Sequence, residues 1–176
     1  VAAFERAHEE RIYMQRSDEY LAYLVDEVIP WVRRSFGVDG GADTWSIMGC
    51  SRAALLCAYA LCEYPGEFGA AACLSPHWPH AVGIVIDWLA EHLPPPGSHR
   101  LYFDYGDQGL DAAYGPYQAR MDHVLEAAGY RNGIDWMTRF FPDDGHAERY
   151  WGARLDHPLR FLYQPRRRHE TRTNLQ

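Results

Sequence analysis

Residues 44–61 read TWSIMGCSRAALLCAYAL, and their apolar pattern changes in the middle of the stretch. Residues 44–48 are typical of a short strand, whereas residues 52–64 are apolar on nearly every side, which favours a helix buried against a sheet. Ser51 lies in the turn between them, where a serine is either the cap of the helix or a nucleophile held above the sheet edge. A G-x-S-x-G nucleophile elbow needs glycine at position 53, where this chain has Ala53.

The rest of the chain continues this succession of strands and helices. Further strands are expected at residues 70–75, 100–106 and 134–141. Helices are expected at residues 16–37, 81–93, 114–129 and 147–163. Pro30 should kink or divide the first of these helices. The alternation predicts an α/β fold with a mostly parallel sheet and helices on both faces.

The chain is long enough for one domain with a real core and too short for two. We expect a single domain over residues 1–164 and a disordered tail over residues 165–176, which have no apolar period. The net charge of −7 argues against nucleic acid or an anionic membrane as a partner. No apolar run is long enough to span a membrane, and no secretory signal is visible.

The reactive residue types narrow the chemistry further. Every basic residue other than histidine is arginine, and the absence of lysine excludes a Schiff-base or lysine-nucleophile mechanism. The four cysteines form no C-x-x-C pair and no Cys/His spacing typical of zinc; they are Cys50, Cys57, Cys62 and Cys73. We therefore expect buried, reduced thiols in a cytoplasmic protein, with no metal and no organic cofactor.

Three of the expected strands are followed by residues that could do chemistry. Ser51 follows the first strand, the loop with Asp107 and Asp111 follows the third, and His146 follows the fourth. In open α/β sheets, functional groups collect at the carboxyl ends of the strands. The chain order of serine, acid and histidine is that of an α/β-hydrolase triad.

Each of these residues also has a plain structural interpretation. Ser51, Asp107 or Asp111 could each cap a helix, and a single histidine beside a glycine is more often structural than catalytic. In the catalytic interpretation, Ser51 is the nucleophile, His146 is its base, and a carboxylate orients the imidazole. The backbone N–H of Arg52, at the start of the helix, would then be one donor of the oxyanion hole.

Several segments of the chain also resemble one known family. They are IMGCSRAALLCAYALCEYPGEFGAAACLSPHW, FDYGDQGLDAAYGPYQARMDHVLEAAGY and DDGHAERYW. These segments are similar to the putative-esterase family of α/β-hydrolases, the group related to esterase D, enterochelin esterase and the feruloyl esterases. The resemblance implies that Ser51 is the nucleophile and His146 the base. It makes Asp111 the first choice for the acid and Asp107 the second.

The chain departs from the family pattern at two places. The family elbow usually has small glycines where this chain has Arg52, Ala53 and Ala54. The early strands of the family, and the loop that would supply a second oxyanion N–H, have no counterpart in these residues. The resemblance therefore implies an N-terminally truncated hydrolase-like sheet. Such a sheet exposes an apolar edge, so we expect the chain to be poorly stable alone or to pair with another copy.

Together these observations predict a serine carboxylic-ester hydrolase that acts on a small-molecule ester through an acyl-enzyme. Two alternatives remain open at this point. One is a catalytically silent relative with a structural or binding role, which the incomplete amino end and Ala53 would favour. The other is an acyltransferase, which passes the acyl group to an alcohol instead of water. His77 and Trp78 are expected either to line an acyl pocket or to pack in the core.

Overall fold

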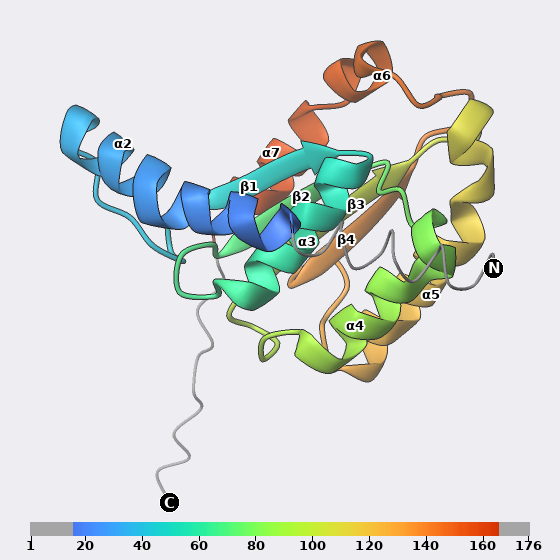
Figure 1. Ribbon diagram of the computed structural model, residues 1–176. Coiled ribbons are helices and arrows are strands. Elements are labelled where there is room, and N and C mark those ends of the chain that lie inside the picture. The colour runs from blue at the N-terminus through green and yellow to red at the C-terminus, as the bar shows by residue number, and fades with distance from the viewer. Residues whose placement is uncertain (1–15, 166–176) are drawn as a thin grey trace, which may run out of the picture.

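The computed structural model describes residues 16–165, and its centre is a four-stranded sheet (Figure 1). The strands are β1 (Ser46–Cys50), β2 (Ala70–Leu74), β3 (Arg100–Tyr105) and β4 (Trp136–Phe140). They lie in the order β1-β2-β3-β4, and every neighbouring pair is parallel. The predicted mostly parallel sheet is thus confirmed. Because all strands run the same way, their carboxyl ends meet at one edge.

Helices cover both faces of the sheet, as predicted. The helices that connect successive strands are α3 (Arg52–Glu63), α4 (Ile84–His92) and α5 (Gly115–Ala127). Right-handed crossovers in a sheet of this strand order place these three helices on the same face. The opposite face is covered by α7 (Asp156–Tyr163) (Figure 1).

The core consists of two clusters on opposite faces of the sheet, because side chains alternate between the faces along each strand. On β2 and β3, Ala71, Cys73 and Phe103 belong to the cluster with the connecting helices. Their neighbours Ala72 and Tyr102 pack on the other side with side chains of α7. Successive strand residues point to opposite faces, so one short strand supplies both halves of the core.

Two strands begin two residues later than the sequence predicts. Thr44 and Trp45 donate their backbone N–H groups to the carbonyl of Gly41, within a turn. Ile134 and its neighbour Asp135 donate in the same way to Arg131. Apolar character alone marks these residues as strand, but a backbone N–H already bonded in a turn cannot enter the ladder.

The first helical segment is divided just before Pro30, within the range that the sequence predicts. Residues 16–23 are helical, a π turn η1 (Leu24–Val28) follows, and α2 (Ile29–Phe36) completes the segment. The N–H of Ile29 bonds to the carbonyl of Leu24, five residues back. Proline lacks an N–H and its ring crowds the carbonyl four residues earlier, and a wider turn relieves this crowding.

The same segment packs through Leu21 and Ile29 against Tyr59 and Phe68, on the outer side of α3. Its far end projects beyond the sheet (Figure 1). Trp31, on that end, is 55% exposed. Gly37 adopts a φ of 62° and ends α2 with a left-handed cap.

The expectation of one helix over residues 147–163 is wrong. The structure has two helices there, α6 (Glu148–Ala153) and α7, separated at Arg154 and Leu155. Pro158 explains the break, because it cannot donate to the carbonyl of Arg154 and its ring would collide with that group. The break turns the Arg154 side chain inward, where it is 2% exposed.

Two short 3-10 turns complete the described chain, η2 (His80–Gly83) before α4 and η3 (Gly109–Ala113) before α5. No helix between residues 16 and 165 is both long and apolar enough to cross a membrane. The tail expected to be disordered lies outside the described residues, except for Pro165.

Candidate active site

Three loops at the carboxyl edge of the sheet bring a serine, an acid and a histidine together. Ser51 directly follows β1, Asp111 lies after β3, and His146 lies after β4. The Nε2 atom of His146 is 2.8 Å from the Oγ of Ser51. Its Nδ1 atom is 2.7 Å from Oδ1 of Asp111. Side chains that are 95 and 35 residues apart in sequence therefore form one hydrogen-bonded chain.

Ser51 occupies an unusual backbone conformation. Its φ is 58° and its ψ is −122°, a region that residues other than glycine enter only at a cost of about 1–3 kcal/mol. It stands at the N-cap of α3 but makes no side-chain capping bond. Its hydroxyl is directed to His146 instead, so the interpretation of Ser51 as a helix cap does not describe the structure.

The methyl group of Ala53 is accommodated because the strand before it carries a glycine. A Cβ atom placed on Gly49 would lie 2.7 Å from the carbonyl oxygen of Ala53 and 3.0 Å from its Cβ. Strand β1 and helix α3 thus approach each other too closely for a side chain at Gly49. The small residue that the elbow requires is on the strand, and Ala53 itself is exposed.

Asp111 is buried and held on both carboxylate oxygens. Its Oδ1 faces His146, and its Oδ2 accepts the N–H of Gly106 at 2.9 Å and the hydroxyl of Ser75 at 2.6 Å. A carboxylate only accepts hydrogen bonds, so Nδ1 of His146 carries the proton that lies between them. In the neutral form of the ring, Nε2 carries no proton and can accept the hydroxyl proton of Ser51.

Asp107, the second choice for the acid, has a different set of partners. Its Oδ1 accepts the backbone N–H of Asp143 at 2.9 Å and the side-chain amide of Gln108 at 2.8 Å. The backbone N–H groups of Asp107 and Gln108 both donate to the carbonyl of Asp144. Asp107 therefore joins the acid loop to the histidine loop.

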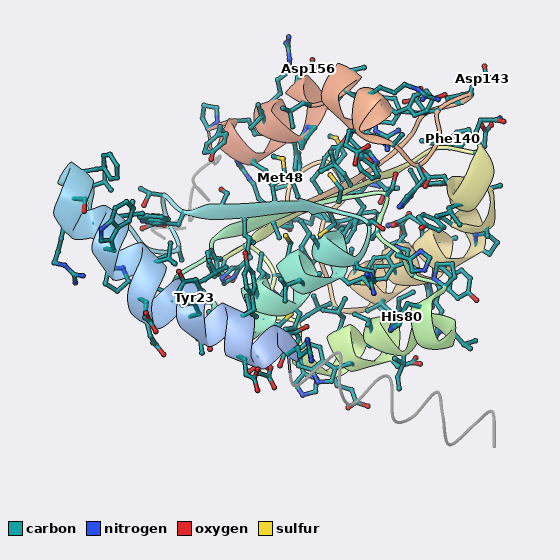
Figure 2. All side chains as sticks on the ribbon, turned by 45° about the horizontal axis from the view of Figure 1, so that its top comes forward. Tyr23, Met48, His80, Phe140, Asp143 and Asp156 are labelled. Carbon is teal, nitrogen blue, oxygen red and sulfur yellow. The ribbon has the colours of Figure 1, made fainter. Side chains whose placement is uncertain are left out.

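Gly106 allows the same two loops to come close. A Cβ atom at Gly106 would lie only 2.1 Å from the backbone oxygen of Asp144. Figure 2 shows Asp143 at the outer end of the histidine loop, beyond Phe140 at the end of β4. Asp143 and Asp144 thus shape this loop through their backbone contacts with Asp107 and Gln108.

Aromatic side chains surround the His146 ring. Trp151 packs edge-on against it at 5.0 Å between centroids, and Tyr114 does so at 5.7 Å. The Tyr114 hydroxyl is 2.5 Å from Nδ1 of His77 and 3.5 Å from Nδ1 of His146. Burial, followed by the neighbouring His146, His80 and Arg52, lowers the pKa of His77. A second, neutral imidazole therefore lies beside the candidate base.

The other residues considered from the sequence fall into clear positions. Trp78 is 1% exposed, packs on Phe103 and donates its indole N–H to Gln118, so it belongs to the core. His77 is half-buried beside the site. The side chain of Arg52 is exposed. All four cysteines are free thiols, and burial raises the pKa of Cys57 to about 12.

Sequence reasoning missed a buried ionic network behind Asp111. Arg154 donates to Asp104 at 2.8 Å, to Asp144 at 3.0 Å and to the hydroxyl of Ser75 at 2.9 Å. Asp104 is fully buried, and this burial raises its pKa to about 6 although Arg154 acts to lower it. Arginine in a polar helix pattern normally faces solvent, so the sequence contains no sign that Arg154 points inward.

Within residues 16–165, no three side chains of His, Cys, Asp or Glu are placed to hold a metal ion. The chemistry available at the carboxyl edge is that of a serine hydroxyl hydrogen-bonded to an imidazole. In such a pair, the imidazole can take the hydroxyl proton while the hydroxyl oxygen attacks an electrophilic carbon.

Residues 2–162 match the model of the family described as "Putative esterase". This match confirms the resemblance seen in the sequence. No curated relative matches the sequence significantly.

Solved structures with the same fold include several esterases. An enterobactin esterase from Shigella flexneri superimposes with a TM-score of 0.67 at 21% identity, over 84% of this chain and 39% of its own. A ferulic acid esterase gives 0.61 at 17% identity, over 81% and 60%. The S-formylglutathione hydrolase of Staphylococcus aureus gives 0.61 at 12% identity, over 85% and 65%. The chain thus spans less than two thirds of each of these proteins.

Proposed function

The chain belongs to the putative esterase family, and from this premise we propose that it is a serine esterase that hydrolyses a small-molecule carboxylic ester. One observation carries the proposal. Ser51 does not cap its helix, and its Oγ lies 2.8 Å from an imidazole nitrogen whose ring is oriented by Asp111. The proposed nucleophile, base and acid are Ser51, His146 and Asp111.

In the proposed first half-reaction, Oγ of Ser51 attacks the ester carbonyl carbon while its proton passes to Nε2 of His146. The imidazolium that forms is stabilised by the Asp111 carboxylate, which stays ionised. The negative charge on the carbonyl oxygen is met by the backbone N–H of Arg52, at the amino end of α3. The C–O bond to the alcohol then breaks, and the alcohol oxygen takes the proton from Nε2.

The second half-reaction uses the same groups with water. His146 removes a proton from water as the water oxygen attacks the acyl carbon. The bond between the acyl group and Oγ breaks, and Nε2 returns its proton to Ser51. The products are the free acid, the alcohol and the unchanged chain.

Replacement of the nucleophile tests the proposal directly. Ser51→Ala should abolish hydrolysis of p-nitrophenyl acetate, because the acyl-enzyme cannot form. Thr138→Val, which removes a hydroxyl that donates to Asp122, is the matched control and should retain activity. Undiminished turnover by Ser51→Ala would exclude Ser51 as the nucleophile.

Two further measurements separate the alternatives. A fluorophosphonate probe reacts only with an activated serine, so failure to label the folded wild-type chain would indicate a catalytically silent relative. An alcohol added to the assay would be acylated by an acyltransferase in preference to water. A hydrolase should instead release the free acid as its main product.

A further inference from the structure

Ser75, directly after β2, links Trp151 and Arg154 to the carboxylate of Asp111 through its hydroxyl. Its side chain is fully buried, and its φ of 42° is in the left-handed region that L-residues rarely adopt. Its backbone N–H donates to the carbonyl oxygen of Asp104 at 2.9 Å and lies 3.2 Å from Oδ1 of the same residue. The backbone of Ser75 is thus held in place by Asp104.

The direction of the Ser75 hydroxyl proton follows from its neighbours. Three polar atoms surround Oγ: Nε1 of Trp151 at 3.0 Å, Nη2 of Arg154 at 2.9 Å and Oδ2 of Asp111 at 2.6 Å. An indole N–H and a guanidinium can only donate. The carboxylate is therefore the acceptor for the hydroxyl proton, and a rotation of the hydroxyl would place its proton against another donor.

The two donors strengthen the hydrogen bond that Ser75 makes. Trp151 lies in α6 and Arg154 directly follows it, and both donate to the same oxygen. A hydroxyl that accepts hydrogen bonds, one of them from a cation, becomes a better donor itself. Its acceptor, Oδ2 of Asp111, is the oxygen opposite the one that faces His146.

We propose that Ser75 is a positioning residue of the esterase site, whose hydroxyl holds the Asp111 carboxylate so that Oδ1 stays directed at His146. Together with the N–H of Gly106, it gives Oδ2 two donors and thereby prevents the carboxylate from rotating. The inference rests on the proposed function and adds to it a residue that follows β2, whereas the proposed nucleophile, acid and base follow β1, β3 and β4. Ser75 touches neither His146 nor Ser51 through its hydroxyl, so it acts through Asp111.

The first test is Ser75→Ala against a matched control. Ser75→Ala should lower kcat about 10- to 100-fold, the range expected from loss of one hydrogen bond to a charged group. KM should change less than about twofold, because no binding contact is removed. Thr138→Val is the control: the Thr138 hydroxyl also donates to a carboxylate, that of Asp122, and also accepts a side-chain N–H, from Gln118. It should leave kcat within about twofold of wild type.

A second test asks whether Ser75 acts through Asp111. In an Asp111→Asn background, Ser75→Ala should lower kcat by no more than about threefold, because effects on a shared interaction are not additive. Equal fold-losses in both backgrounds would overturn the proposal, since they would place the effect of Ser75 elsewhere. So would a kcat for Ser75→Ala no lower than that of Thr138→Val.

A third measurement needs no turnover. The proton between Nδ1 of His146 and Asp111 gives a resolved downfield resonance in the proton NMR spectrum when that bond is formed. Ser75→Ala should shift or broaden this resonance, and Thr138→Val should leave it in place. A wild-type chain that hydrolyses no ester refutes the proposed function, whereas a resonance unmoved by Ser75→Ala refutes the positioning role.

If Ser75→Ala does not fold, Ser75→Cys is the variant that tests the positioning role of Ser75. A thiol fits the same site with a weaker donor, and its kcat should fall below that of wild type with an unchanged KM. A cysteine variant with the kcat of wild type would overturn the proposal.

Discussion

Ser51 adopts its left-handed backbone conformation because two contacts constrain it. Its N–H donates to the carbonyl of Leu74 on the neighbouring strand, and its own carbonyl accepts the N–H of Ala54 in the first turn of α3. The strand ladder and the helix thus fix the residue from both sides. A strained residue persists only where the surrounding structure determines it in this way.

The choice between the two acids is a prediction at the scale of a single residue. Asp111→Asn keeps the shape of the side chain but turns an obligatory acceptor into an amide that can present a donor to His146. We expect kcat to fall by about 10⁴-fold, as for the acid of a serine-protease triad. Asp107→Asn should cost less than about tenfold, because Asp107 meets backbone and amide donors instead. Steady-state kinetics with p-nitrophenyl acetate compare the two, and a larger loss for Asp107→Asn would make Asp107 the acid.

The sequence contains enough to predict which side chains form the hydrogen-bonded chain of the candidate site, but not which side chains lie behind them. Ser51, Asp111 and His146 can be named because strand ends collect functional groups and their order along the chain is informative. Their catalytic roles stay predictions until they are tested. Ser75 and Arg154 could not be named. Their function depends on which side chains meet across the sheet edge, and neither residue type nor spacing indicates that.

At the scale of elements, the break between α6 and α7 places Arg154 where its side chain joins the end of α6 to the sheet. Pro158 ends the hydrogen-bond pattern at Arg154, and the freed side chain reaches β3 through Asp104 and the histidine loop through Asp144. A single continuous helix would have been expected to carry this arginine on its solvent side. Proline within a helical pattern is a recognised signal for such a break, so this part of the fold was open to prediction.

Replacement of Arg154 should destabilise the protein to an extent that depends on pH, because Arg154 pairs with the titratable Asp104. The pKa of Asp104 is raised from 3.8 to about 6, so its contribution to stability is full below pH 3.8 and is lost as pH rises through 6. Arg154 lowers the pKa of Asp104. Arg154→Met should therefore raise this pKa further, so that stability continues to fall up to a higher pH. We expect the variant to lose about 3–5 kcal/mol of unfolding free energy at pH 8, and less at pH 5 where Asp104 is protonated.

Urea unfolding at the two pH values measures this effect. Arg160→Met is the matched control, because Arg160 pairs with Asp156 on the surface of α7, where the two side chains are 82% and 55% exposed. Such an exposed pair is worth about 0–1 kcal/mol at either pH. A loss for Arg154→Met that is equal at pH 5 and pH 8 would contradict the assigned pKa shift of Asp104.

At the scale of the whole molecule, β1 is, like β4, an edge strand, and its second edge has no partner among the described strands. Met48, on β1, is 38% exposed (Figure 2). Exposed strand edges with apolar side chains promote association between chains. The alternation of apolar segments predicts the fold class. It does not predict what pairs with the free edge of β1, because backbone groups pair without regard to residue type.

We therefore expect the chain to self-associate at high concentration and Met48→Lys to weaken that association. A charged side chain on an edge strand opposes edge-to-edge pairing. Light scattering coupled to gel filtration, over a series of concentrations, measures the mean mass of each protein. Ile84→Lys, at another exposed apolar residue on α4, is the control and should leave the mass unchanged. A monomeric wild-type chain at every concentration would contradict the expectation.

The arrangement of Ser51, Asp111 and His146 also has a consequence for the synthesis of the protein. They follow β1, β3 and β4, so the hydroxyl of Ser51 does not meet the imidazole of His146 until β4 has joined the sheet. A ribosome releases the chain from its amino end, and Ser51 leaves it some 95 residues before His146 does. During the synthesis of the residues between them, the nascent polypeptide therefore carries Ser51 without the imidazole of His146. Under the proposed function, covalent labelling of Ser51 by a fluorophosphonate probe would therefore begin only when β4 has joined the sheet of the nascent chain.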